Sequence, residues 1–474
     1  MSKGKELAKN TLIITIGKIS TQFISFFLIP LYTTYLDTAD YGTVDLINTY
    51  ISLLVPIVTL QLEQAVFRFL IDARKDEEQK KVIISNIFRV IIIHSIIFLM
   101  LGIVLSNLIT LDYKYFLIIN VIVCMMSSLN LQIARGLGET KVYTYGSMMT
   151  GLISVTLNVL LIAVIKMNAK GILISNCIAN IICNIYLFKK LKLNNYIKTK
   201  SKKNPKMIKS MYKYSLPLIP NSISWWIINV SDRTIISLIL GLSYNGIYSI
   251  SNKFSNIYIL IYNLFNLSWT ESVSLYINDN NNKNFFEEMT NRMFNLFASI
   301  CILIIAGLPM VFNWIIKGDY KLAYNYMPIL LVASLFNVVV GLYSAVYVAK
   351  KETKELAKSS VISAIINIIV NLLLIKHIGL YAAAISTLVA YLVLMIYRYI
   401  DVKKYVNIKL NKKNLIILNL LLLVSIMCYY YSNIYLCILN LIIIIIMSII
   451  INKELINSLI EYLKQYILRK KDVK

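Results

Sequence analysis

Long apolar runs, each about as long as a membrane-crossing helix, follow one another along the whole chain. A helix needs about 20 mostly apolar residues to cross a bilayer, and runs such as 434–451 do not alternate as the strands of a barrel would. The pattern predicts an all-α integral membrane protein with fourteen transmembrane helices. Their approximate limits are 10–35, 43–70, 82–108, 113–134, 144–165, 171–188, 214–240, 246–276, 293–316, 327–349, 359–375, 378–397, 414–431 and 434–452.

Lysine and arginine are unequally divided between the two sides of these spans. Of the 48 such residues, 37 fall in connections on one side, six in connections on the other and five within spans. Because cytoplasmic loops are enriched in Lys and Arg, we expect a multi-pass protein of the plasma membrane with both termini in the cytoplasm. The basic run 194–209 links two spans and contains one aromatic residue, so nucleic-acid binding is not favoured.

The composition excludes several classes of protein. The chain is 58% hydrophobic and 15% charged, with a net charge of +25, whereas soluble domains are about 45–50% apolar and 25% charged. The outer connections are short, all six cysteines lie in spans, and no phosphate-binding loop or Ser-His-Asp set is apparent. We therefore expect no catalytic residues, no metal site, no cofactor and no enzymatic activity.

Two parts of the chain repeat each other. Residues 36–50 align with 240–254 at an offset of 204, so that Gly42 meets Gly246; further along, Asn158 meets Asn371 at an offset of 213. Duplication of this kind is common in transporters. It predicts two six-helix lobes in parallel orientation: an N-lobe at 1–193, a basic linker at 194–213, a C-lobe at 214–402, and two further helices with a basic tail at 403–474.

Polar side chains inside four of the spans recur at helical spacing. Steps of three, four and seven residues put them on one helical face, and because polar groups are costly in hydrocarbon, such faces point to a packed interior or a wet cavity. Interhelical hydrogen bonding is the alternative. The faces comprise Thr11, Thr15, Lys18, Gln22 and Ser25; Asp45, Asn48, Ser52, Thr59 and Glu63; Ser222, Asn229 and Arg233; and Ser249, Asn252, Asn256, Asn263 and Thr270.

Arg233 and Lys253 are the intramembrane cations with the clearest functional interpretation. Each costs about 2.5–3.5 kcal/mol at a helix centre on insertion scales, and both fall in the outer halves of their spans, where the positive-inside bias gives no reason for them. A cavity with a positive lining suits an anionic substrate. Asp232 either neutralises one of the two cations or takes part in ion coupling.

Two other charged residues keep two interpretations each, and a third has one. Lys18 either lines the cavity or extends to the inner membrane surface. Arg68 follows Glu63 by five residues, and it either forms a local ion pair or anchors the span at the interface. Glu63 is a further candidate for ion coupling.

The residues that follow the linker resemble a known family. The stretch 212–254 contains a Ser-Leu-Pro and a second proline, a Ser-Asp-Arg, and a Gly-x-Tyr with a lysine shortly after. It resembles the signature of the polysaccharide-transporter, or oligosaccharide flippase (Wzx-like), family of the MATE/MOP superfamily. The likeness extends over essentially the whole chain, since 41–42, 63–69 and the pair 158–175 and 371–386 are also similar to that family.

This resemblance implies a fold and a function. The fold would be two lobes around a central cavity lined by spans 1, 2, 7 and 8, the four spans with polar faces. The function would be export of an undecaprenyl-pyrophosphate-linked oligosaccharide across a bacterial membrane by alternating access, for capsule or other cell-surface polysaccharide. Arg233, Lys253 and Arg68 would be cavity cations, with Lys18 added by its helical face. Membrane lipids and polysaccharide polymerase or glycosyltransferase machinery would be partners.

The energy source and two other functions stay open. Without a nucleotide-binding motif, transport would use a Na⁺ or H⁺ gradient, the membrane potential, worth about 2.3 kcal/mol per charge per 100 mV, or downstream consumption. The first alternative function is a MATE-type exporter of drugs or organic cations, which would line its cavity with acids. The second is a membrane-bound polymerase or glycosyltransferase, which would need catalytic groups on a sizeable outer loop.

Overall fold

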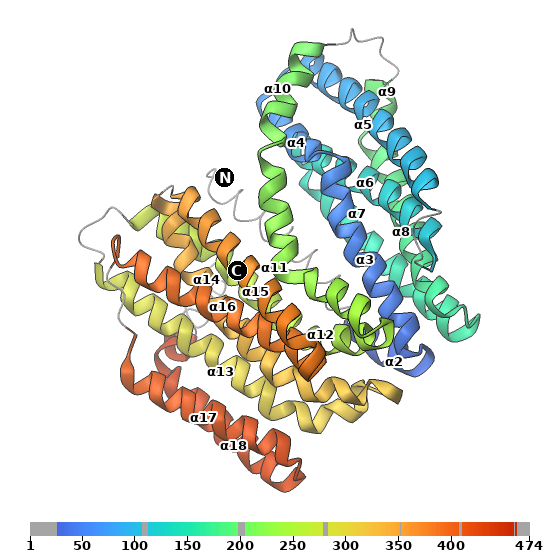
Figure 1. Cartoon of the computed structure of the whole chain (residues 1–474). Coiled ribbons are helices and arrows are strands. Elements are labelled where there is room, and N and C mark those ends of the chain that lie inside the picture. The colour runs from blue at the N-terminus through green and yellow to red at the C-terminus, as the bar shows by residue number, and fades with distance from the viewer. Residues whose placement is uncertain are drawn as a thin grey trace, which may run out of the picture. The chain divides into compact units, whose positions relative to one another are not determined.

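The computed structural model describes residues 26–106, 112–197, 204–277, 283–350, 352–406, 410–458 and 460–461. Every element in these ranges is helical (Figure 1). Eleven of the described helical segments are long and apolar enough to cross a membrane. The prediction of an all-α chain of membrane-length helices is therefore confirmed, while the count of fourteen spans stays a prediction.

Contacts divide the chain into two units, and the division falls within one long helix, α12 (Leu242–Tyr276). Unit 1 comprises residues 1–250 and 317–321, and unit 2 comprises 251–316 and 322–474. The helices of unit 1 before α12 are α2 (Ile29–Tyr35), α3 (Thr38–Val58), α4 (Leu62–Asp72), α5 (Glu77–Leu105), α6 (Lys114–Leu137), α7 (Thr140–Asn158) with the π-helical turn η1 (Val159–Val164), α8 (Asn168–Lys190), α9 (Leu193–Ile197), α10 (Pro205–Ser215) and α11 (Leu218–Ile239).

Unit 2 continues from α12 through six further long helices. They are α13 (Lys283–Ile315), α14 (Met327–Lys350), α15 (Thr353–Ile378), α16 (Leu380–Val402), α17 (Lys412–Tyr431) and α18 (Ile434–Ile451), and the 3-10 segment η3 (Gly318–Tyr326) precedes α14. Predicted segments 3 to 14 each coincide with a helix, where segment 5 comprises α7 and η1. Segment 2 is divided between α3 and α4, and segment 1 lies mostly outside the described residues. The predicted linker 194–213 overlaps α10, an amphipathic helix of unit 1 whose Met211 packs in the same apolar cluster as Leu62 and Leu129.

Side-chain caps explain why two helices start earlier than their apolar runs. Asp37 accepts a hydrogen bond from the Asp40 amide at 2.6 Å, and Asp76 accepts one from the Gln79 amide at 3.0 Å. Each cap satisfies an amide that the first turn of a helix leaves free. As a result α3 and α5 begin at residues 38 and 77, before the apolar segments that start at 43 and 82.

The predicted span 43–70 is not one continuous helix. Between α3 and α4, Leu60 and Gln61 adopt the left-handed conformation, with φ angles of 52° and 57°. Pro56 lies in the last turn of α3, where it lacks an amide hydrogen and its ring crowds the preceding turn, which favours a helix end. The left-handed conformation costs roughly 1–2 kcal/mol per residue, so surrounding contacts hold the break in place.

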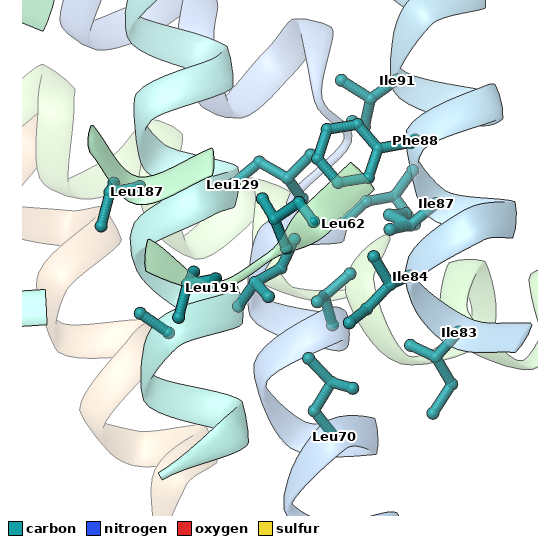
Figure 2. Packing of buried hydrophobic residues seen from close by; sticks show 14 of the residues in the cluster. Leu62, Leu70, Ile83, Ile84, Ile87, Phe88, Ile91, Leu129, Leu187 and Leu191 are labelled. Atoms are coloured by element: carbon teal, nitrogen blue, oxygen red, sulfur yellow. The ribbon is translucent and has the colours of Figure 1, made fainter. Parts of the chain in front are cut away.

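The packing around this break forms the apolar core of unit 1. Ile84, Ile87 and Ile91 repeat at helical spacing on α5 and pack in one cluster with Leu62 of α4 and Leu129 of α6 (Figure 2). Association of membrane helices depends on such close packing, because lipid tails are as apolar as the side chains. The cluster therefore fixes α4 directly after the left-handed residues.

A fully buried arginine joins three helices of unit 2. Arg398 on α16 is 1% exposed, and its guanidinium donates hydrogen bonds to the hydroxyls of Ser344 at 2.5 Å, Ser359 at 3.2 Å and Ser360 at 2.9 Å. Each hydroxyl in turn donates to a carbonyl of its own helix. The predicted apolar segment ends at residue 397, whereas α16 continues past Arg398 to Val402.

Replacing Arg398 by alanine is expected to destabilise the protein by about 3 kcal/mol, because it removes charge-assisted hydrogen bonds and leaves a cavity. Thermal unfolding of the purified protein measures the change. Lys354, an exposed cation on α15, provides the control: Lys354→Ala should change stability by about 0.5 kcal/mol or less. Equal melting temperatures for the two variants would refute the role of Arg398 in holding the helices.

Candidate functional site

Helix α3 and the start of α12, both in unit 1, cross at two glycines. A Cβ atom added to Gly42 would lie 1.9 Å from the Leu242 carbonyl oxygen, and one added to Gly246 would lie 2.0 Å from the Thr38 carbonyl oxygen. The Asn245 side chain donates to the Gly42 carbonyl at 2.8 Å. The two backbones can approach this closely only because neither glycine has a side chain.

The crossing is symmetric at the repeat offset of 204 residues. Residue 42 meets 242 and residue 246 meets 38, and these positions are equivalent in the alignment of 36–50 with 240–254. Reciprocal contacts of this kind are typical of copies related by a two-fold axis. The geometry of the crossing thus agrees with the repeat that was read from the sequence.

Near this crossing, a buried ion pair links three helices. Asp45 on α3 accepts a hydrogen bond from the Ser249 hydroxyl on α12 at 2.6 Å, and its other oxygen lies 2.7 Å from Nε of Arg233 on α11. The Arg233 and Asp45 side chains are only 11% and 15% exposed. At such burial the pair is little screened by salt, and removing either partner would leave the other charge uncompensated.

Asp232 lies beside Arg233 on α11 and has its own partner. The Tyr248 hydroxyl on α12 donates to the Asp232 carboxylate at 2.9 Å, and Asp232 is 3% exposed. In these pairings two carboxylates accompany one guanidinium. The sequence identified both acids and the arginine, but neither Tyr248 nor the pairing of Asp45 with Arg233, because the polar faces of single helices do not show which helices meet.

Beyond the ion pair, the next two residues of the polar face of α3 are exposed. Asn48 and Ser52, which follow Asp45 at steps of three and four residues, are both exposed. Next to this face, the Trp226 indole on α11 donates to the Thr49 carbonyl at 3.0 Å. The face therefore continues from the ion pair along the helix.

The break after α3 leaves a carboxylate buried in the first turn of α4. Glu63 is 4% exposed, and one of its side-chain oxygens has no hydrogen-bond partner among the described residues. The Gln61 side chain donates to the Ser222 hydroxyl on α11 at 2.7 Å and so ties the break to that helix. The positive end of the α4 dipole favours a negative charge at Glu63.

Arg68 forms an ion pair within its own helix. Its guanidinium lies 2.5 Å from the Asp72 carboxylate, one turn along α4, and the two side chains are 47% and 67% exposed. Of the two interpretations of Arg68, the structure therefore shows the local ion pair, and its role as a cavity cation stays a prediction. An exposed pair of this kind contributes little to stability.

The remaining predicted residues lie elsewhere. Lys253 and Asn252 on α12 are half-buried and Asn256 is exposed, and all three belong to unit 2. Lys18 and Gln22 lie outside the described residues, as does the side chain of Asn229. Among the residues that the structure describes, no three His, Cys, Asp or Glu side chains gather in a way that would hold a metal ion.

Two family models match the sequence. The model described as polysaccharide biosynthesis protein matches residues 7–273, more than half of the chain, and the model described as lipid II flippase MurJ matches residues 329–452. A comparison with curated protein sequences finds no match.

Solved structures with the same fold cover most of the chain. A lipid II flippase MurJ in an inward closed conformation matches with a TM-score of 0.69 and 18% identity, over 96% of this chain and all of that one. An inward-facing multidrug resistance MATE family transporter of the MOP superfamily matches with a TM-score of 0.67 and 10% identity, over 84% of this chain and 98% of that one. A MOP superfamily transporter from Pyrococcus furiosus, described as having a binding pocket of reverse polarity, matches with a TM-score of 0.58 and 11% identity, over 84% of this chain and 96% of that one.

Proposed function

Because the chain belongs to the family of polysaccharide biosynthesis proteins, we propose that it moves a lipid-linked oligosaccharide from the cytoplasmic to the outer leaflet of a bacterial plasma membrane. The substrate would be linked through undecaprenyl pyrophosphate and used for capsule or another surface polysaccharide. The second family match and the MOP-type fold support a flippase rather than an enzyme. Fourteen helices in two six-helix lobes, with two helices appended, complete the proposed architecture.

The placement of Arg233 carries this proposal. Its guanidinium is buried among three long helices and pairs with the Asp45 carboxylate at 2.7 Å. A pyrophosphate offers the same negative oxygen atoms in the geometry that arginine binds bidentately. A substrate that enters the cavity can therefore compete with Asp45 for this cation.

Competition for Arg233 would couple the binding of substrate to the opening of the outer end of the transporter. By the positive-inside orientation, the connection between α11 and α12 is on the outer side, so the contacts of Asp45 with Arg233 and Ser249 hold the outer ends of α3, α11 and α12 together. A ligand shifts a conformational equilibrium by its differential affinity for the two states. A pyrophosphate that takes Arg233 from Asp45 would weaken the closed outer end and favour the outward-open state.

Loss of the protein from cells is expected to leave the lipid-linked oligosaccharide on the inner leaflet. The measurement labels the saccharide on the outer surface of spheroplasts and compares it with the total lipid-linked pool. The flippase should be needed for outer labelling and not for synthesis of the oligosaccharide. A loss of the oligosaccharide itself, or of a glycosidic bond, would instead indicate a glycosyltransferase or polymerase.

We also propose that Glu63 carries the coupling ion. One buried oxygen of Glu63 has no hydrogen-bond partner within the part of the chain that the structure describes, so it can take a proton or help to bind Na⁺, whereas Asp232 already accepts a hydrogen bond from Tyr248. Glu63→Gln should therefore make transport in vesicles insensitive to an imposed H⁺ or Na⁺ gradient. Glu78→Gln, at an exposed glutamate of α5, should keep the response of the unmodified protein. A Glu63→Gln protein that still responds fully to both gradients would exclude this role.

A multidrug or organic-cation exporter is the second candidate function. One observation favours it: two carboxylates, those of Asp45 and Asp232, accompany the single guanidinium of Arg233. Drug resistance conferred by the protein on a sensitive host, without any effect on outer-leaflet oligosaccharide, would support this function over the flippase.

A further inference from the structure

A second site lies at the predicted cytoplasmic end of unit 1, apart from the residues of the ion pair. It is a pocket of about 470 Å³ between the ends of α5, α6 and α8 and the short helix α9. These ends are cytoplasmic in the orientation set by the positive-inside rule. The inference drawn from this pocket does not depend on the proposed function.

Four lysines line the pocket together with the carboxylates of Glu77 and Glu139, and two of the lysines form no ion pair among the described residues. Lys80 pairs with Glu77 at 2.7 Å and Lys81 with Glu78 at 2.8 Å. Lys190 and Lys192 also line the pocket, and no ion pair joins either of them to a carboxylate of the described residues. Two ammonium groups are therefore available to an anionic ligand.

The same pocket has an apolar part. Leu137 at the end of α6 and the buried Leu191 line it together with the half-buried Tyr196 ring. It lies at the ends of three membrane-length helices, where the chain leaves the bilayer. A ligand that fits both parts has a negative charge next to an apolar body, and it reaches the pocket from the membrane surface.

We propose that this pocket binds the phosphate of an anionic phospholipid of the inner leaflet. Lys190 and Lys192 hold the phosphate, and Leu137 and Leu191 contact the glycerol and the first carbons of the acyl chains. Basic pockets between helices on the cytoplasmic side bind anionic headgroups in this way. The lysines of the pocket thus do more than orient the chain in the membrane.

The test compares two double variants of the full-length protein. Lys190→Ala/Lys192→Ala removes the unpaired cations of the pocket. Lys206→Ala/Lys209→Ala removes the same charge from exposed positions on α10, in the same unit and outside the pocket. Native mass spectrometry of protein released from detergent, titrated with phosphatidylglycerol or phosphatidylcholine, gives the affinity for the first bound lipid.

Phosphatidylglycerol should bind the unmodified protein more tightly than phosphatidylcholine. The Lys190/Lys192 variant should bind phosphatidylglycerol about 25-fold more weakly, since each lysine near a membrane surface contributes about 1 kcal/mol and 1.4 kcal/mol is a factor of ten. The Lys206/Lys209 variant should change the affinity less than about twofold.

Three outcomes would overturn the proposal. Equal losses in both double variants would mean a diffuse attraction to basic loops. No preference for phosphatidylglycerol in the unmodified protein would mean that the pocket does not bind this headgroup. Complete displacement of the lipid by millimolar inorganic phosphate would assign the pocket to a soluble phosphate compound instead.

Discussion

Arg233→Ala is expected to lower the rate of oligosaccharide transfer by about 100-fold or more. The substitution removes the cation proposed to bind pyrophosphate and leaves the Asp45 carboxylate, 15% exposed, without its charge partner. An arginine can make two charge-assisted hydrogen bonds to a phosphate, each worth about 1.5–3 kcal/mol, and each 1.36 kcal/mol is a factor of ten in rate. Complementation of a flippase-deficient strain, with membrane levels measured in parallel, detects the loss.

A comparison with Asp45→Asn separates substrate binding from closure of the outer end. Both variants break the ion pair, but only Arg233→Ala removes the cation. If Arg233 binds substrate, the Asp45→Asn protein should keep at least about tenfold more transport activity than the Arg233→Ala protein. The Arg233→Lys protein should keep part of the activity of the unmodified protein, because lysine supplies the positive charge without the planar fork of arginine. Equal activity of Arg233→Ala and the unmodified protein, at equal membrane levels, would remove Arg233 from the site.

Gly246→Ala is expected to disrupt the crossing of α3 and α12 and to reduce transport at least tenfold. The new Cβ would lie 2.0 Å from the Thr38 carbonyl oxygen, and backbone cannot move aside as a flexible side chain can. Overpacking of this kind costs about 1–3 kcal/mol or more. The helices must separate, which draws the Ser249 hydroxyl away from Asp45.

Gly307 provides a matched control for this substitution. It lies in α13, and a Cβ added to it would have no atom within 4 Å among the described residues. Gly307→Ala should leave transport unchanged and, by helix propensity, raise stability by up to about 1 kcal/mol. Normal activity of Gly246→Ala would show that the close contact is not needed. A loss in both variants would show that the effect is not specific to the crossing.

Much of the fold can be predicted from the sequence, because apolar runs of membrane length are a strong signal. The two-copy repeat is equally informative, since it aligns Gly42 with Gly246, the two residues at which α3 and α12 cross. The break at Leu60 and Gln61 cannot be predicted in this way. Neither residue has an intrinsic preference for the left-handed conformation, so only tertiary packing reveals it.

The candidate site is predicted only in its parts. Periodicity identified Asp45, Arg233 and Ser249 on three separate helical faces, but pairing between helices depends on packing that one sequence does not show. Trp269 shows the same limit: its position in a predicted span does not reveal that it is 2% exposed, donates to the Leu342 carbonyl and packs against Phe265. Arg398 was missed because an arginine at the end of an apolar run is typical of a loop.

Transfer of a lipid-pyrophosphate oligosaccharide between the leaflets of vesicles is the most direct measurement of what this protein does. The purified protein should speed the appearance of a labelled oligosaccharide on the far leaflet, and the Arg233→Ala protein should not. No acceleration by correctly folded, correctly oriented protein would contradict the account. So would an equal rate for the two proteins.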